Sequence, residues 1–127
     1  MSDRIEIVPT PWYTAEVRAL PREDRDRIDR RLETFTGKGW GPAQRDATLK
    51  HLRDGIYELR VLGTGAAYRV LFFVMLGRSP RVVVLTTCVA KSVMKKRHRM
   101  DSEIDRASSR RAEWLEDQKK GEDDERQ

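Results

Sequence analysis

The sequence predicts an α+β fold in which helices pack on a small antiparallel sheet. Three runs rich in Val, Leu, Tyr and Phe follow one another between residues 56 and 90, and these residue types favour strands. Glycine- and proline-containing turns separate the runs. Charged segments with apolar residues at helical spacing precede and follow them. The chain has 127 residues, enough for one domain with a single core.

The first part of the chain predicts one strand and two helices. Alternating apolar and charged residues predict a short strand over residues 4–8, which prolines end. A brief helical segment should follow from Trp12 to Leu20, and a second helix at about residues 22–36. Three apolar residues lie on one stripe of that second helix: Ile28, Leu32 and Phe35. Its other face is charged, and we interpret it as solvated.

Residues 37–55 predict a loop, with a turn of helix near residues 47–52. The glycine and lysine spacing in GKGWGP does not match a phosphate-binding loop. Trp40 in this segment can stack on a base or pin the loop to the core, and the second use is the commoner one.

The centre of the chain predicts a three-strand meander over residues 56–62, 67–76 and 81–90. The segment Gly63-Thr64-Gly65 offers residues that tolerate positive φ, so it suits the first turn. Apolar residues occupy both faces of the second strand, which predicts a central strand covered on both sides. Arg69 begins this strand, and a buried arginine is costly unless it forms an ion pair or lines an open groove. An ion pair with Glu58 is the purely structural alternative to a functional role.

A last helix should begin after Met100, where Asp101 or Ser102 can cap it. Its apolar positions continue to Trp114 and Leu115, which should dock on the sheet or on a partner. We therefore expect one domain over residues 1–117 and a charged mobile tail over residues 118–127.

The composition argues against several classes of function. Cys88 is the single cysteine and the chain has two histidines, so neither a disulfide framework nor a metal-ligand spacing is present. We expect no cofactor. No apolar stretch is long enough to span a bilayer, and the polar N-terminus does not resemble a signal peptide, so we expect a cytoplasmic protein.

Cations concentrate around the meander. Residues 88–99 contain no acid and six Lys, Arg or His residues. Guanidinium and ammonium groups bind phosphate oxygens and stabilise the charge that develops during phosphodiester cleavage. RNA supplies a nucleophile in its 2′-hydroxyl, so such a site needs only in-line positioning and proton transfer. The candidate residues are Arg60, Arg69, Lys91 and His98 for catalysis, and Lys95, Lys96 and Arg97 for phosphate binding.

The ordered set YELR, YRVLFF, VAK and the lysine-rich segment before DSEIDRA resembles the phage Gp49-like, HigB-type branch of the RelE/ParE toxin superfamily. The resemblance covers roughly residues 3–116. It implies a RelE-like fold and the toxin of a type II toxin–antitoxin system that cleaves mRNA, usually on the ribosome, without a metal. It also implies a helix-turn-helix, HigA-like antitoxin, with operator DNA bound only through the toxin–antitoxin complex.

The resemblance also implies roles for individual residues. Arg60 in YELR stands where the family has a basic residue, and Arg69 in AAYRV stands at the phosphate-contacting arginine. Lys91 ends the third strand of the meander, where basic residues of the family point into the site. This chain has Ser92 after it and KKRH at the end of the segment, and it lacks a tyrosine there. His98 is the candidate proton donor or acceptor in that position.

Two other functions remain open from the sequence. One is a toxin on the same fold that inhibits DNA gyrase without cleaving RNA, as ParE-like relatives do. The other is a phage accessory protein whose cations only bind the phosphates of a nucleic acid.

Overall fold

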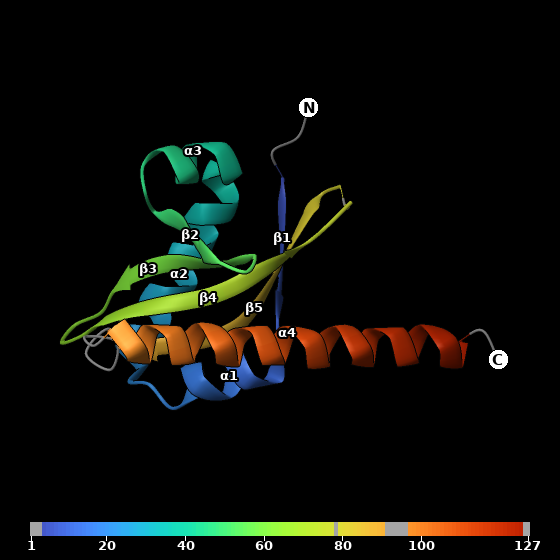
Figure 1. Cartoon of the computed structure of the whole chain (residues 1–127). Helices are drawn as coiled ribbons and strands as arrows, with labels where there is room; N and C mark the ends of the chain where they lie inside the picture. The colour runs from blue at the N-terminus through green and yellow to red at the C-terminus, as the bar shows by residue number, and fades with distance from the viewer. Residues whose placement is uncertain (1–3, 78, 91–96, 126–127) are drawn as a thin grey trace.

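A mixed sheet of five strands forms the centre of the computed structural model (Figure 1), which describes residues 4–77, 79–90 and 97–125. The side chains of residues 97–99 and 122–125 lie outside the description. The elements in chain order are β1 (Ile5–Pro9), α1 (Pro11–Arg18), α2 (Arg22–Lys38), α3 (Trp40–Arg45), β2 (Leu49–Arg53), β3 (Ile56–Leu62), β4 (Ala67–Met75), β5 (Arg81–Ala90) and α4 (Arg97–Glu125). The predicted α+β fold with a C-terminal helix is confirmed.

The strand order is β1-β5-β4-β3-β2, and β1 runs parallel to β5. The expectation of a wholly antiparallel sheet was therefore wrong at this edge. Ile7 pairs with Val83 across some 75 residues of intervening chain. The alternation within each strand fixes which side chains share a face, but it does not specify a partner this distant.

The predicted loop at residues 37–55 was also wrong, because it contains α3 and β2. The residues Asp54 and Gly55 connect β2 to β3, and both have positive φ, 54° and 74°. An Asp-Gly pair of this kind forms the tight turns that join antiparallel strands. β2 pairs antiparallel with β3, with Leu49 opposite Leu59. The short β2 segment LKHLR is too polar for its composition to indicate a strand. The Asp54-Gly55 turn was therefore the sequence feature that could have indicated β2.

The meander is confirmed, and β4 lies at the centre of the sheet with an apolar core on each side. One core contains Val70 and Phe72 of β4 and packs against α1, α2 and α3. The other contains Leu71 and Phe73 and packs against Ile104 of α4. Burial of both faces explains why β4 is almost continuously apolar.

Trp40 pins α3 to the first core. Its ring centroid lies 5.0 Å from that of Tyr57 and 6.3 Å from those of Phe35 and Phe72. The guanidinium of Arg81 lies 4.3 Å from the centroid of the Trp40 ring. These contacts occupy the indole, which supports the packing interpretation of this tryptophan.

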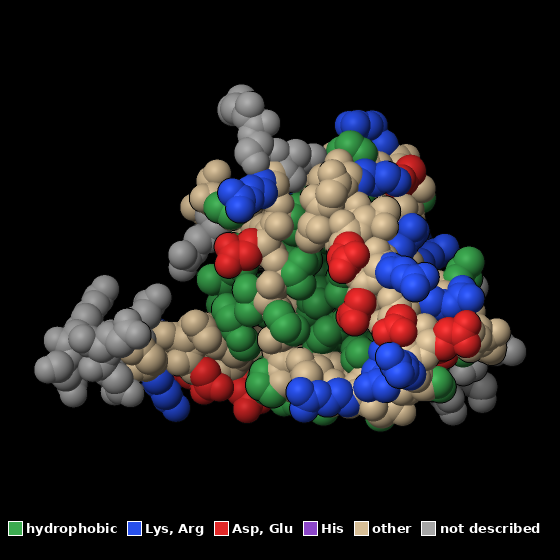
Figure 2. Space-filling model, turned by 180° about the vertical axis from the view of Figure 1, so that it is seen from behind, with side chains coloured by type: hydrophobic (Ala, Val, Ile, Leu, Met, Phe, Trp, Pro, Cys, Tyr) green, Lys and Arg blue, Asp and Glu red, His purple; other side chains and the backbone are tan. Residues whose placement is uncertain are grey.

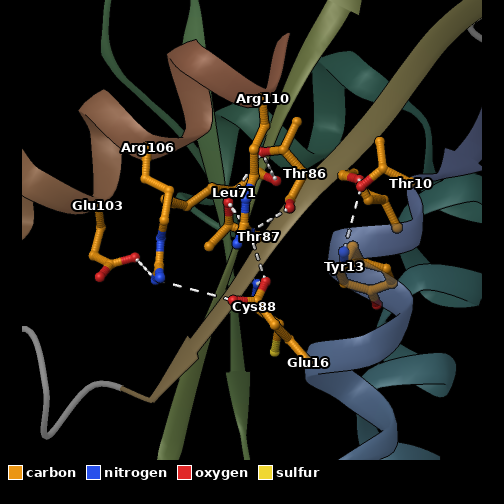
Figure 3. A network of polar contacts seen from close by, with 11 residues as sticks. Thr10, Tyr13, Glu16, Leu71, Thr86, Thr87, Cys88, Glu103, Arg106 and Arg110 are labelled. Carbon is orange, nitrogen blue, oxygen red and sulfur yellow. Dashed lines mark hydrogen bonds and ion pairs between the residues drawn. The ribbon is translucent and has the colours of Figure 1, made fainter. Parts of the chain in front are cut away.

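Side chains from α1 and α4 close the edge of β5 beyond the end of β1 (Figure 3). The Glu16 carboxylate of α1 accepts a hydrogen bond from the backbone N–H of Cys88 at 3.2 Å. Nη1 of Arg110 on α4 donates to the same carboxylate at 2.8 Å and to the carbonyl of Thr86 at 2.9 Å. The network joins α1, β5 and α4 by charge-assisted hydrogen bonds, and so it fixes the position of α4 on the sheet.

Asp24 of α2 holds the turn between β3 and β4. Its Oδ1 accepts hydrogen bonds from the backbone N–H of Thr64 at 2.8 Å and from the Thr64 hydroxyl at 3.0 Å. The Tyr68 hydroxyl donates to Oδ2, which lowers the pKa of Asp24 and raises that of Tyr68 to about 12. The carboxylate therefore fastens the hairpin to α2.

Gly63 is required by close approach. A Cβ on Gly63 would lie 2.6 Å from the carbonyl oxygen of Ala66 and 2.9 Å from Oδ1 of Asp24. Neither Gly63 nor Gly65 has positive φ, so the turn does not use the tolerance of positive φ for which we considered these glycines suitable.

The C-terminal helix α4 begins at Arg97, earlier than predicted, and continues to Glu125. Met100 packs on the second core, which accounts for a helical turn ahead of the predicted cap. Trp114 docks on Phe73, with ring centroids 5.9 Å apart. Residues 118–125, which we assigned to the tail, continue the helix, although Gly121 and two aspartates in this segment have low helix propensity. Among the described helices, no segment has the length and apolar character required to cross a bilayer.

Replacement of Gly63 by alanine should destabilise the protein by roughly 1–3 kcal/mol, because backbone atoms of the turn must move. Gly65→Ala is the matched control, since a Cβ there meets no atom within 4 Å. We expect the control to change stability by less than about 1 kcal/mol. Urea unfolding measures both differences, and equal values for the two variants would contradict the steric role of Gly63.

Asp24→Asn should destabilise the protein at neutral pH, and the difference from the parent should shrink in acid. The folded-state pKa of Asp24 lies below its ordinary value of 3.8, so its contribution is present above pH 3.8 and is lost as the pH falls through the folded-state pKa. Thermal unfolding between pH 7 and pH 3 measures this. Asp26→Asn, an exposed position on the same helix, is the control for loss of charge. A difference that stays constant with pH would exclude the ionised Asp24 carboxylate as the cause.

Candidate functional site

Arg60 and Arg69 meet across two adjacent strands around one buried carboxylate. The two arginines are direct register partners of β3 and β4, so their side chains leave the same face of the sheet. Glu58 precedes Arg60 by two residues and shares this face. Its Oε1 lies 3.2 Å from Nε of Arg60, and its Oε2 lies 3.4 Å from Nε of Arg69. We call these three residues the Glu58 cluster.

The three members of the Glu58 cluster differ in exposure. The Glu58 side chain is 1% exposed, that of Arg69 is 16% exposed and that of Arg60 is 55% exposed. The carboxylate is therefore enclosed, whereas one guanidinium faces solvent and the other is partly accessible. Like charges that face each other across strands repel, and the shared carboxylate offsets that repulsion.

The ion pair that we considered as a structural alternative for Arg69 is present, and Arg60 shares it. Two guanidinium groups and one carboxylate leave a net charge of +1, because Glu58 is shared. A purely structural pair would match one cation with one anion. The excess charge and the exposed Arg60 leave guanidinium N–H donors available for an anion.

The beginning of α4 returns to the Glu58 cluster. Nη1 of Arg69 donates to Sδ of Met100 at 3.3 Å. Arg69 also pairs in register with Val89, next to the end of β5 at Ala90. The two ends of the lysine-rich segment, Ala90 and Arg97, are thus anchored to strands and helix that adjoin Arg69.

The other predicted site residues belong to the segment that starts after Ala90. Lys91, Lys95 and Lys96 lie outside the described residues. Arg97 and His98 open α4, and their side chains are outside the description. The structure thus brings together Arg60 and Arg69, and the roles of all the candidate residues stay predictions.

Sequence reasoning treated Glu58 only as a possible ion-pair partner and missed its central position. The available signal was the spacing of Glu58 and Arg60, which places both on one face of a strand. Sequence reasoning also missed a second cationic surface, which arginines of α2 form beside the end of β3, because the charged face of α2 was interpreted as solvated.

Other reactive side chains in the described part of the chain do not form a competing site. The Cys88 thiol is buried, which raises its pKa to about 12, so it remains protonated at neutral pH. Within the described ranges, no cluster of three or more His, Cys, Asp or Glu residues could hold a metal ion. The chemistry that the described side chains can supply is recognition of an anion by arginine.

Comparison with known proteins gives one family match. The family model described as Phage derived protein Gp49-like (DUF891) matches residues 15–112, a range that includes α2, the whole meander and the first half of α4. No curated protein gives a significant match, and neither does any solved structure.

Glu58→Gln should destabilise the protein by roughly 2–4 kcal/mol, since it leaves Arg69 partly buried without its counter-ion. A second variant, Glu58→Gln with Arg69→Met, should recover part of the loss, because it removes the unpaired charge. Urea unfolding of both variants and of Arg69→Met alone measures the coupling between the two positions. Additive effects would contradict the ion pair as the source of stability.

Proposed function

Because the chain belongs to the phage-derived Gp49-like family, a family of RelE/HigB-like toxins, we propose that it is a metal-independent mRNA endoribonuclease that acts on ribosome-bound message. The family indicates the toxin of a toxin–antitoxin system with an antitoxin partner. The observation that supports the nuclease proposal is the Glu58 cluster, in which two guanidinium groups converge on one face of the sheet.

In this proposal, Arg60 and Arg69 hold the non-bridging oxygens of the scissile phosphate. The neighbouring 2′-hydroxyl attacks the phosphorus, and the 5′-oxygen of the next nucleotide leaves, which yields a cyclic phosphate. Negative charge grows on the phosphate oxygens during attack, so preorganised guanidinium donors stabilise the transition state more than the ground state.

Glu58 is a positioning residue in this proposal. Its oxygens lie against both guanidinium groups and its side chain is enclosed, so it fixes the orientation of the arginines. We assign proton transfer to His98 or to a lysine of the segment after β5, either Lys91, Lys95 or Lys96. A lysine among other cations has a lowered pKa, and an imidazole titrates near neutral pH. Arg97 would bind a flanking phosphate.

The proposed partner is a helix-turn-helix antitoxin of the HigA type, and operator DNA would be bound only through the complex with it. The family supports an antitoxin partner, and the resemblance to HigB-type toxins supports the choice of the HigA type. A protein of this kind would act in the cytoplasm, where its message substrate is translated.

The test is induction of the chain in bacterial cells, with growth and mRNA cleavage measured together by primer extension. Removing one phosphate-contacting arginine should lower cleavage by about 10²–10³-fold, so Arg69→Ala and Arg60→Ala should relieve growth arrest. His98→Ala should also reduce cleavage if the imidazole carries a proton. Arg22→Ala, an exposed position on α2, is the matched control and should remain toxic.

The same experiment separates the rival functions. A gyrase inhibitor would arrest growth with uncut message and with altered plasmid supercoiling. An accessory nucleic-acid-binding protein would leave both growth and message unchanged. Full toxicity and full cleavage by Arg60→Ala and Arg69→Ala would remove the assignment of the Glu58 cluster as the site.

A further inference from the structure

A groove of about 550 Å³ lies between α2 and the end of β3. β2 begins opposite Leu59, so residues 60–62 of β3 extend past it and form the floor of the groove. Arginines 27, 30 and 31 of α2 and Arg60 of β3 line it, with the threonines at positions 34 and 48. We call this feature the α2 groove.

Arg31 is held at the bottom of the α2 groove. Its Nε donates to the backbone carbonyl of Arg60 at 3.2 Å, and its Nη2 donates to Oγ1 of Thr48 at 3.3 Å. The guanidinium therefore covers the open edge of β3 beside the start of β2. These contacts place one guanidinium in a fixed position, which reduces the entropy that it loses on binding a ligand.

Positive charge dominates the lining of the α2 groove. The lining has four arginines and one acid, Asp46. Lys38 forms an ion pair with Asp46 and lowers the pKa of that carboxyl, so this acid already has a counter-ion. Arg27 lies 3.8 Å from Glu23, but both side chains are well exposed and such a pair is weak. Figure 2 shows many Lys and Arg side chains on one side of the molecule seen from behind, with Asp and Glu side chains among them.

The α2 groove adjoins the Glu58 cluster through Arg60. The backbone carbonyl of Arg60 accepts from Arg31 in the groove, whereas its guanidinium contacts Glu58. The cluster lies on the α4 face of the sheet and the groove on the α2 face, so a ligand held by Arg60 reaches the groove by passing around the open edge of β3 at residues 60–62. Val61 and the 78%-exposed Leu62 add apolar surface along this path.

We propose that the α2 groove binds the phosphates of single-stranded RNA on one side of the cleavage point, with Arg27 and Arg30 as the contacting residues. This inference extends the proposed nuclease function by naming a second contact surface for the same substrate. Single-stranded RNA fits because it combines a chain of phosphates with bases that can lie on apolar surface. An acidic segment of a protein would satisfy the arginines, but it would have no use for the continuity with the Glu58 cluster.

The test measures RNA binding without cleavage. The probe is a twelve-nucleotide single-stranded RNA that carries 2′-O-methyl groups throughout, so that attack by a 2′-oxygen cannot occur. Fluorescence anisotropy gives its affinity for the full chain between 50 and 200 mM salt. The double variant Arg27→Gln/Arg30→Gln should lower the salt dependence of log K by about 1.4, since each phosphate contact on a single strand contributes about 0.7. Affinity at 100 mM salt should fall at least about tenfold.

Arg18→Gln/Arg22→Gln is the matched control. It removes the same charge from exposed positions at the end of α1 and the start of α2, outside the α2 groove, and should keep the parental slope. Thermal unfolding of both variants checks that the fold is intact. An unchanged slope for the groove variant, or an equal loss for both pairs, would overturn the proposal.

The outcomes distinguish this inference from the proposed function. If the parent binds the probe through the groove but leaves message intact in cells, the groove assignment stands and the nuclease assignment fails. If the parent cleaves message and the groove variant keeps the parental slope, the nuclease stands and the groove assignment fails. Loss of antitoxin binding by the groove variant, with RNA binding unchanged, would identify the groove as a protein-binding surface and overturn the proposal.

Discussion

The carboxylate of Glu58, shared between Arg60 and Arg69, is the constraint on which the candidate site depends. Two arginines that face each other across adjacent strands repel, and one of them is mostly buried. The enclosed carboxylate offsets that repulsion, because it accepts a hydrogen bond from Arg60 and forms an ion pair with Arg69. A single carboxylate leaves one positive charge in excess. The ion pair with Glu58 therefore permits the partial burial of Arg69 and still leaves positive charge that can bind an anion.

The remainder of the fold holds the strands that carry this cluster. β4 is buried on both faces, so the position of Arg69 is set by two cores. Asp24 fastens the turn between β3 and β4 to α2, which keeps Arg60 and Arg69 in register. The network of Glu16 and Arg110 fixes α4 on the sheet, and Met100 of that helix contacts Arg69. Together these contacts limit the movement of the strands that carry the cluster.

The sequence predicted the meander and the central position of β4, because apolar residues on both faces of a strand indicate that both faces are covered. It did not predict β2, whose five residues are mostly polar and depend on the Asp54-Gly55 turn and on pairing with β3. It also did not predict that β1 runs parallel to β5, because long-range pairing leaves no local pattern. For the candidate site, residue type and alternation indicated two arginines on one sheet. That both arginines share the carboxylate of Glu58 is visible only in the structure.

The difference between local sequence pattern and long-range contact also explains why the charged face of α2 was interpreted as solvated. Periodicity places Arg27 and Arg30 away from the apolar stripe of the helix, and most such faces only meet water, whereas Arg31 lies three residues after Ile28 and borders the stripe. Here β2 begins only opposite Leu59 and leaves the last part of β3 open, and Arg31 donates to the carbonyl of Arg60 at this open edge. A surface arginine becomes part of a groove because a neighbouring strand is short. As a result, Arg60 belongs both to the Glu58 cluster and to the α2 groove. A polyanion bound at Arg60 and Arg69 would meet further arginines around the open edge of β3, and this edge is open because β2 begins opposite Leu59.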